Sequence, residues 1–489
     1  MSAPVKSPAR FALKDEPRLK LDEFRGRVTS SVRSGNTLLM LCAMPEADGL
    51  HLCAALGARD QGTIELALSE RVQTSYWALT PDCPQAHLFE REIFEQHGLR
   101  PEGHPWLKPV RLHGKDSPAG PYEYFQVEGA EIHEVAVGPV HAGIIEPGHF
   151  RFQCHGEHVF HLEISLGFQH RGLEKALIEN PARRLFYMET AAGDTTIGHT
   201  LAYCRVAQSL GDGATGKVTE ALRATALELE RLANHTGDLG ALAGDTGYLP
   251  TMSYCGRLRG DFLNMTALLC GSRFGRGLLS ESGVKHQLYE KTAEELLKRL
   301  KDTGRDVENA VNLLWDTPSV LARFEETGRL SAQQAEELGL VGPAARASGI
   351  DRDARRDFPS GYYLSRRNFQ PALCHTGDVC ARAKVRWMEI KDSLALLKLS
   401  IPHAIGAPEE TPLSKFAPES IAVAVEEGWR GEICHLARTD SGGGLDYYKI
   451  TDPSFKNWTG LAQALRGQQI SDFPLCNKSF NLSYCGYDL

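Results

Sequence analysis

Cysteines are the residues with the most scope for metal and redox chemistry in this sequence, and their spacing limits that chemistry. Twelve cysteines occur among 489 residues, but no two of them form a Cys-x-x-Cys pair. Zinc ribbons and iron–sulfur loops usually need such pairs, because one turn must present two thiolates to one ion. Residues 1–18 contain no apolar run typical of a signal peptide, so we expect reduced thiols, most of them buried and structural.

Two short segments contain residues that could take part in acid–base chemistry. The first, residues 192–199, contains Asp194 and His199, and the second, residues 481–489, contains Ser483. Carboxylates and imidazoles can load and release protons as nearby charge changes. A structural interpretation competes with this one. Asp194 precedes a predicted helix over 197–210 and fits an N-cap, and His199 fits a hydrogen-bonded core histidine.

Composition and charge exclude several function classes. The formal net charge is -8, and no strongly basic segment occurs, which argues against nucleic-acid binding. No run of about 18 apolar residues is present, so we expect no membrane-spanning helix. The hydrophobic fraction of 42% suffices for a large core, and the length predicts two or more domains.

Hydrophobic periodicity predicts the elements that must position these residues. A short helix over 86–98 ends at Gly98, and apolar residues at helical spacing predict a long helix over 219–240, on which Glu228 and Arg231 can pair. Further helices are predicted over 286–302 and 305–314, and strands over 37–41, 63–68, 131–165, 420–425, 431–438 and 447–450.

The predicted fold class is α+β, in two parts. We expect a flexible N-terminus over 1–18, a small α/β domain over 19–115 and a Gly- and Pro-rich linker over 116–126. Residues 127–489 form a mainly helical domain that opens with a β hairpin or sheet and ends in strands.

Several segments resemble known families. Residues 89–105, with Glu90-Arg91-Glu92 and Gly103-His104-Pro105, resemble the signature of the respiratory complex I 30 kDa subunit. The rest resembles the complex I 49 kDa subunit and, more closely, the large subunit of group 4 nickel-iron hydrogenases. The segments that carry this resemblance are 138–152, His170-Arg171-Gly172-Leu173-Glu174-Lys175, 228–235 and 452–458. A fusion of both parts over residues 80–489 is typical of formate hydrogenlyase large subunits.

The sequence departs from these families at the positions of their cofactors. Nickel-iron enzymes hold their metals through four thiolates from two Cys-x-x-Cys motifs. Anchored on His199, the first motif places its cysteines at Ala192 and Thr195; anchored on Asp488, the second places them at Ser483 and Gly486, with Cys485 one residue out of register. We therefore expect no metal ligands and no nickel-iron centre. The quinone-contacting Tyr and His of complex I align with Gly193 and near Ile145, so neither is preserved.

The resemblance implies roles for the residues that remain. Glu146 occupies the position of a proton relay beside the hydrogenase metal, although pairing with a nearby Arg is an equal alternative. We expect Glu146, Asp194 and His199 to form a proton relay in the cavity. The cavity is expected to be lined by Thr195, Thr196 and Ser483, and the interface with a partner subunit to contain His170, Arg171, Glu230 and Arg231.

The expected function is that of a subunit in a membrane-associated, hydrogenase-related or complex I-like oxidoreductase. It would lie on the cytoplasmic side of the inner membrane as a peripheral subunit. Its expected partners are an iron–sulfur small subunit similar to the complex I PSST subunit, which carries the cluster, and antiporter-like and complex I-like membrane subunits. We expect no cofactor bound by this chain, with quinone possible. The alternatives are a non-catalytic scaffold subunit and a hydrogenase with rearranged ligands.

Overall fold

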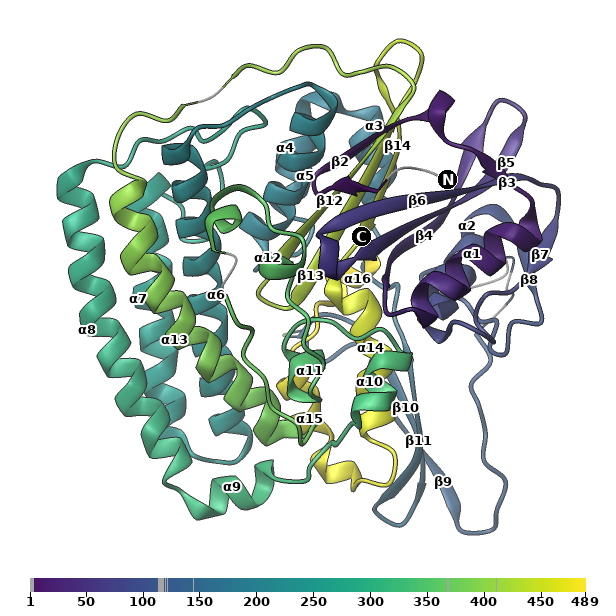
Figure 1. The fold of residues 1–489 in the computed structure, drawn as a ribbon. Helices are drawn as coiled ribbons and strands as arrows, with labels where there is room; N and C mark the ends of the chain where they lie inside the picture. The colour runs from purple at the N-terminus through teal and green to yellow at the C-terminus, as the bar shows by residue number, and fades with distance from the viewer. Residues whose placement is uncertain are drawn as a thin grey trace.

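A five-stranded sheet organises the N-terminal part of the chain, drawn in purple in Figure 1. The computed structural model describes residues 4–489 except 113–117, 119, 121, 144, 367–368 and 410. The strand order is β1-β6-β5-β4, with β3 pairing in parallel with β6. The elements of this part are β1 (Val5–Lys6), β2 (Ala9–Ala12), β3 (Arg18–Leu19), α1 (Leu21–Arg33), β4 (Thr37–Glu46), β5 (Gly49–Ala58), β6 (Thr63–Val72), β7 (Ser75–Trp77), α2 (His87–His97) and β8 (Arg100–Glu102).

The prediction of a flexible N-terminus over 1–18 is wrong for residues 4–18. Strand β1 pairs with β6, whereas β2 leaves this sheet and pairs with β12 near the other end of the chain. Ala9 and Phe11 are buried in that pairing, and their alternation with Arg10 is the period of a half-buried strand. Within the predicted linker over 116–126, residues 116, 117, 119 and 121 lie outside the described residues, and its extent stays a prediction.

The middle of the chain begins with a three-stranded antiparallel sheet and continues in helices. The sheet has the order β11-β10-β9. Its strands are β9 (Ile132–Val137), β10 (His149–His155) and β11 (His158–Ser165). The helices are α3 (Leu173–Glu179), α4 (Arg184–Met188), α5 (Thr196–Leu210), α6 (Lys217–Asp245), α7 (Leu249–Cys270), α8 (Glu290–Trp315), α9 (Pro318–Phe324), α10 (Ala332–Glu337), α11 (Gly342–Ala347), α12 (Ala354–Asp357) and α13 (Val379–His403).

Four long helices, α6, α7, α8 and α13, pack side by side in the helical part (Figure 1). The two helices predicted over 286–302 and 305–314 are one continuous helix, α8. Gly304 is the reason: a Cβ there would lie 3.0 Å from Leu394 on α13, so glycine allows the helices to approach closely without ending α8. On α6, the predicted pair between Glu228 and Arg231 is confirmed, with Nε to Oε2 at 3.2 Å.

The C-terminal sheet joins the two parts of the molecule. Its order is β14-β13-β12-β2, and α5 packs against β12 and β13. The elements are β12 (Ser420–Gly428), β13 (Gly431–Thr439), β14 (Leu445–Thr451), α14 (Pro453–Ala464), α15 (Phe473–Phe480) and α16 (Tyr484–Asp488). One apolar cluster runs from the N-terminal sheet through β10 and β11 to α14–α16, and a second fills the helical part. The predicted α+β class is confirmed.

Candidate functional site

Three segments that are far apart in the sequence meet at the thiol of Cys485. The thiol contacts the carboxylate of Glu146 and the backbone amide of Gly193, and its Sγ lies 3.3 Å from Oγ of Ser483. Burial and the Glu146 charge raise the pKa of Cys485 to about 11, so the thiol stays protonated at neutral pH. The alternative pairing of Glu146 with an arginine is not found among the described residues.

Hydrogen bonds from His170 and Arg171 hold together the segments that meet at Cys485. The Arg171 guanidinium donates to carbonyl oxygens in two of them, those of Thr190 at 2.8 Å, Ala191 at 2.8 Å and Cys485 at 3.2 Å. His170 Nδ1 lies 2.7 Å from the carbonyl oxygen of Asp488. The side chains of both motif residues remain exposed, so a contact with a partner stays a prediction for them.

The carboxylate of Asp194 is bound by the turn between β12 and β13. Arg430 donates to it through both terminal nitrogens, at 2.5 and 2.8 Å, and through Nε to the carbonyl oxygen of Asn481 at 2.6 Å. Burial alone would raise the pKa of Asp194, but the Arg430 guanidinium outweighs it and lowers the pKa below its usual value. Arg430 therefore links the loop before α5 to the C-terminal segment. The interpretation of Asp194 as a helix cap is wrong.

Glu230 on α6, rather than Asp194, caps the N-terminus of α5. Its carboxyl oxygens accept from the amides of Ile197 at 2.7 Å and Gly198 at 3.2 Å, in the first turn of α5. Burial raises the pKa of Glu230 to about 8. The N-cap residue of α5 makes no side-chain hydrogen bond to the first turn. Glu230, from the neighbouring helix, accepts hydrogen bonds from the amides of that turn instead.

Thr195 and Thr196, and two of the predicted interface residues, make their contacts within this chain. Thr195 Oγ1 lies 3.3 Å from Arg430, while Thr196 donates its hydroxyl to the carbonyl oxygen of Glu189 at 3.0 Å. Glu230 is 8% exposed and Arg231 is fully buried, donating to carbonyl oxygens at the end of β12. This chain itself covers both side chains, and their contact with a partner subunit stays a prediction.

His199 begins a buried chain of hydrogen bonds. Its Nε2 lies 2.9 Å from Oδ2 of Asp452, and its Nδ1 lies 3.1 Å from Nε2 of His435. His435 Nδ1 in turn lies 2.8 Å from the hydroxyl of Tyr448. One set of tautomers satisfies every bond: Tyr448 donates to His435, His435 to His199, and His199 to Asp452. Burial lowers the pKa of His435 well below its usual value, in keeping with a neutral ring.

Helix α16 lies beside this chain of hydrogen bonds. Ser483 caps it by accepting from the amide of Gly486 at 2.9 Å. Asp452 lies directly against Gly486, and a Cβ placed on that glycine would approach Asp452 Oδ2 to 2.6 Å. Asp452 also accepts from the amide of Ser454 at 2.6 Å and so caps α14. The hydrogen-bonded chain therefore ends at the backbone beside Cys485.

Sequence reasoning missed Arg430, His435 and Tyr448 in this site. Only Asp452 had a local signal, since Asp-Pro-Ser is typical of a helix N-terminus. Elsewhere within the described ranges, one cluster could hold a metal ion: donor atoms of Glu46, Asp48 and His51 lie within 4.8 Å of one another, on the N-terminal sheet.

Comparisons with known proteins identify the family to which the chain is similar. Residues 245–411 match the family described as the 49 kDa subunit of the respiratory-chain NADH dehydrogenase. Formate hydrogenlyase subunit 5 of Escherichia coli is 29% identical over 84% of this chain and 76% of its own length. The membrane-bound hydrogenase subunit alpha of Pyrococcus furiosus is 26% identical over 69% of this chain and 83% of its own length.

An NADH-quinone oxidoreductase subunit of Clostridium beijerinckii is 30% identical over 66% of this chain and 87% of its own length. No helix within the described residues is long and apolar enough to cross a membrane. The relatives include subunits of membrane-bound hydrogenases and of complex I. The chain therefore belongs to the family that unites the 49 kDa subunit of respiratory complex I with the large subunits of group 4 nickel-iron hydrogenases of the formate hydrogenlyase type.

Proposed function

We propose that this chain is a peripheral subunit of a membrane-bound complex that works without a nickel-iron centre. It couples electron transfer at an iron–sulfur cluster of a partner subunit to proton movement, or to quinone chemistry, on the cytoplasmic side. Antiporter-like membrane subunits would complete the assembly. The proposal rests on the residues that meet around Cys485. Protonatable groups converge there, whereas the four thiolates of a hydrogenase are missing from the sequence.

The residues at the four ligand positions do not fit a nickel-iron group. Ala192 and Gly486 have no donor side chain, and the space beside Gly486 is taken by Asp452. The hydroxyl of Ser483 is committed to capping α16, and that of Thr195 lies between Asp194 and Arg430. Hydroxyl groups are poor ligands for a soft low-valent metal, and one protonated thiol, Cys485, cannot replace four thiolates.

Proton movement is the chemistry that the remaining groups support. Glu146 can exchange a proton beside Cys485, and the chain from Asp452 to Tyr448 leads away from it into the protein. A proton taken up here would compensate the charge of an electron that arrives on the partner's cluster.

Elemental analysis of the purified complex tests the absence of the metal. We expect iron from the partner subunit and well under a tenth of a nickel atom per chain, with no hydrogen evolution from reduced methyl viologen. Stoichiometric nickel would overturn the proposal and support a hydrogenase with rearranged ligands.

Redox titration of the partner's cluster tests the coupling. We expect its midpoint potential, followed by electron paramagnetic resonance, to fall by up to about 59 mV per pH unit, the slope for one proton per electron. Glu146→Gln should flatten this slope, whereas Glu295→Gln on the exposed face of α8 should not. A potential that is independent of pH in the unsubstituted complex would favour the alternative of a non-catalytic scaffold.

A further inference from the structure

Two buried cysteines face each other across neighbouring strands of the N-terminal sheet. Cys42 on β4 is the direct partner of Cys53 on β5 in the antiparallel register. Residues opposite each other in such a pair point to the same face of the sheet, with Cα atoms about 4.5 or 5.5 Å apart. Disulfides need Cα atoms about 4.4–6.8 Å apart, so the backbone places these side chains where a disulfide can form. Both thiols are free, and the thiol of Cys53 donates a hydrogen bond to the sulfur of Cys42.

The surroundings of Cys42 favour its thiolate form. Its sulfur accepts hydrogen bonds from Cys53 and from the hydroxyl of Tyr447 on β14, and the ammonium group of Lys449 lies nearby on the same strand. The hydrogen bond from Cys53, together with these two groups, lowers the pKa of Cys42 although the sulfur is buried. The same contact between the thiols raises the pKa of Cys53 well above its usual value. The two sulfurs therefore differ in reactivity, with Cys42 as the nucleophile.

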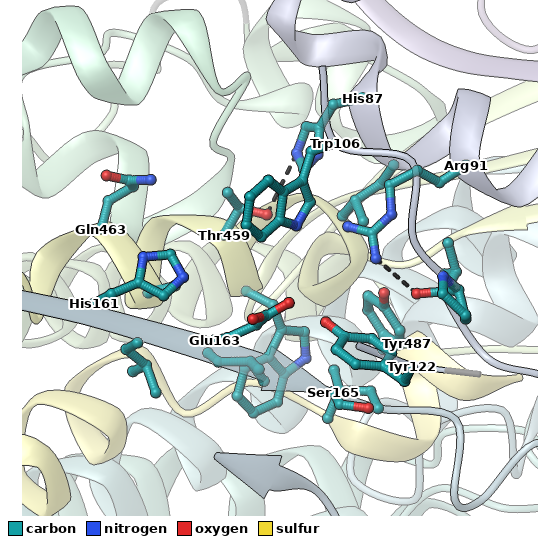
Figure 2. A pocket seen from close by; sticks show the side chains of 18 of the residues that line it. His87, Arg91, Trp106, Tyr122, His161, Glu163, Ser165, Thr459, Gln463 and Tyr487 are labelled. Atoms are coloured by element: carbon teal, nitrogen blue, oxygen red, sulfur yellow. Dashed lines mark hydrogen bonds between the residues drawn. The ribbon is translucent and has the colours of Figure 1, made fainter. Parts of the chain in front are cut away.

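Lys449 belongs to a cluster of charges between the N-terminal and C-terminal sheets. Its Nζ lies 2.6 Å from a carboxyl oxygen of Glu92 on α2 and 3.1 Å from one of Glu174 on α3, and the charge of Glu92 offsets part of the effect of Lys449 on Cys42. The residue before Glu92, Arg91, instead lines a cavity of about 290 Å³ between α2, β11 and α14, which Figure 2 shows. Neither cysteine of the pair lines that cavity, so the pair is a separate feature of the molecule.

Burial restricts the kind of oxidant that can reach the pair. Cys42 is 2% exposed and Cys53 is 1% exposed, so a large reagent cannot contact either sulfur in the folded chain. The pairing of β5 with β6 shifts register between His51 and Cys53, and such an irregularity locally disrupts the ladder of hydrogen bonds. Hydrogen peroxide is close to water in size, and it is therefore the class of oxidant that suits this site.

We propose that Cys42 and Cys53 form a peroxide-sensitive pair that closes to a cross-strand disulfide. The Cys42 thiolate attacks one peroxide oxygen: an S–O bond forms, the O–O bond breaks, and the departing hydroxide takes up the proton that the Cys42 thiol lost. The sulfur of Cys53 then attacks the sulfenic acid: the S–S bond forms, the S–O bond breaks, and a second water leaves with the Cys53 proton. The two sulfurs lose two electrons in total, and the peroxide gains them. This inference does not depend on the proposed function.

Mass spectrometry of the full chain after peroxide treatment tests the proposal. The reduced chain is treated with a low molar excess of hydrogen peroxide, unfolded and alkylated. Trypsin releases residues 34–59 with both cysteines, and a further cleavage after Glu46 separates them, so the two fragments stay joined only through a disulfide. We expect these joined fragments, and we expect dithiothreitol to separate them. Cys255 is equally buried, and burial alone raises its pKa to about 12, so it is the internal control and should remain a free thiol.

Two variants separate the roles of the neighbouring groups. Tyr447→Phe should slow formation of the joined fragments about 10-fold, because the Cys42 thiolate loses one hydrogen bond. Cys53→Ser should stop the reaction at the sulfenic acid, which dimedone then traps at Cys42. Arg299→Gln, on an exposed face of α8, should leave the rate unchanged. Melting curves of each variant check that the fold is retained.

The unsubstituted chain can also refute the proposal without any variant. Oxidation of Cys255 as fast as that of the pair would show that the pair has no special reactivity. Sulfinic acid at Cys42 beside a free thiol at Cys53 would show that the disulfide does not form. Oxidised glutathione should produce the joined fragments at least about 10-fold more slowly than peroxide, since it must reach a buried sulfur. Equal rates with the two oxidants would overturn the assignment of a small peroxide.

Discussion

Replacing Arg430 should open two segments at once, since its guanidinium is bound to both. It holds Asp194 in the loop before α5 and the carbonyl oxygen of Asn481 just before α16. Removing one partner of a buried ion pair costs about 3–5 kcal/mol. Asp194 keeps 32% of its side chain exposed and would regain water, so we expect about 2 kcal/mol for Arg430→Gln.

Hydrogen exchange followed by mass spectrometry measures this loss locally. In the regime where exchange reports the opening equilibrium, about 2 kcal/mol corresponds to roughly 30-fold faster exchange in peptides from 189–198 and 481–489. Arg430→Lys keeps the charge but loses the two-pronged geometry, so its effect should be intermediate. Arg299→Gln is the matched control. Unchanged exchange, or faster exchange in one of the two segments alone, would refute the link.

Three further changes probe the same region. Gly486→Ala should lower the melting temperature, because its Cβ would press on Asp452 and overpacking costs about 1–3 kcal/mol, whereas Gly193→Ala meets no atom within 4 Å and should be neutral; equal effects would contradict the packing. Glu230 has a folded-state pKa raised from 4.5 to about 8, so the stability it contributes is complete below pH 4.5 and is lost as the pH rises through 8. The melting temperature of Glu230→Gln should therefore fall less between pH 5 and pH 9 than that of the unsubstituted chain, and parallel curves would contradict this. Iodoacetamide should alkylate Cys485 slowly at pH 8 and about tenfold faster per pH unit up to about 11; a plateau near pH 9 would show an ordinary thiol.

Local patterns in the sequence predicted local structure well. The pair of Glu228 with Arg231 follows from a spacing of one helical turn, and Gly98 ends α2 in the left-handed conformation that its position indicated. The separation of the helices predicted over 286–302 and 305–314 is wrong, because Gly304 between them allows a close contact with Leu394 on another helix and does not end α8.

The candidate site was predictable only in part, since its partners come from distant elements. Asp194 before Thr195 fits a cap by every local criterion. The structure instead gives Asp194 to Arg430, 236 positions away, and gives the capping role to Glu230. A short-range rule cannot rank such competitors, because the outcome depends on which side chains the tertiary fold brings to the same amides. Residues 192–196 and 483–486 were nevertheless expected in one place, and their contact through Cys485 agrees with that.

The pairing of β2 with β12 has a consequence for how this chain is made. Residues 9–12 are synthesised some 400 residues before the strand that they pair with, residues 420–428. At about 5–20 residues per second, the nascent N-terminal segment waits tens of seconds without its partner strand. A sheet closed by contacts of such large sequence separation forms slowly, and until then β12 presents an open edge to other chains. We therefore expect a variant that lacks the first 12 residues to aggregate during expression, before it can assemble with its partner subunits.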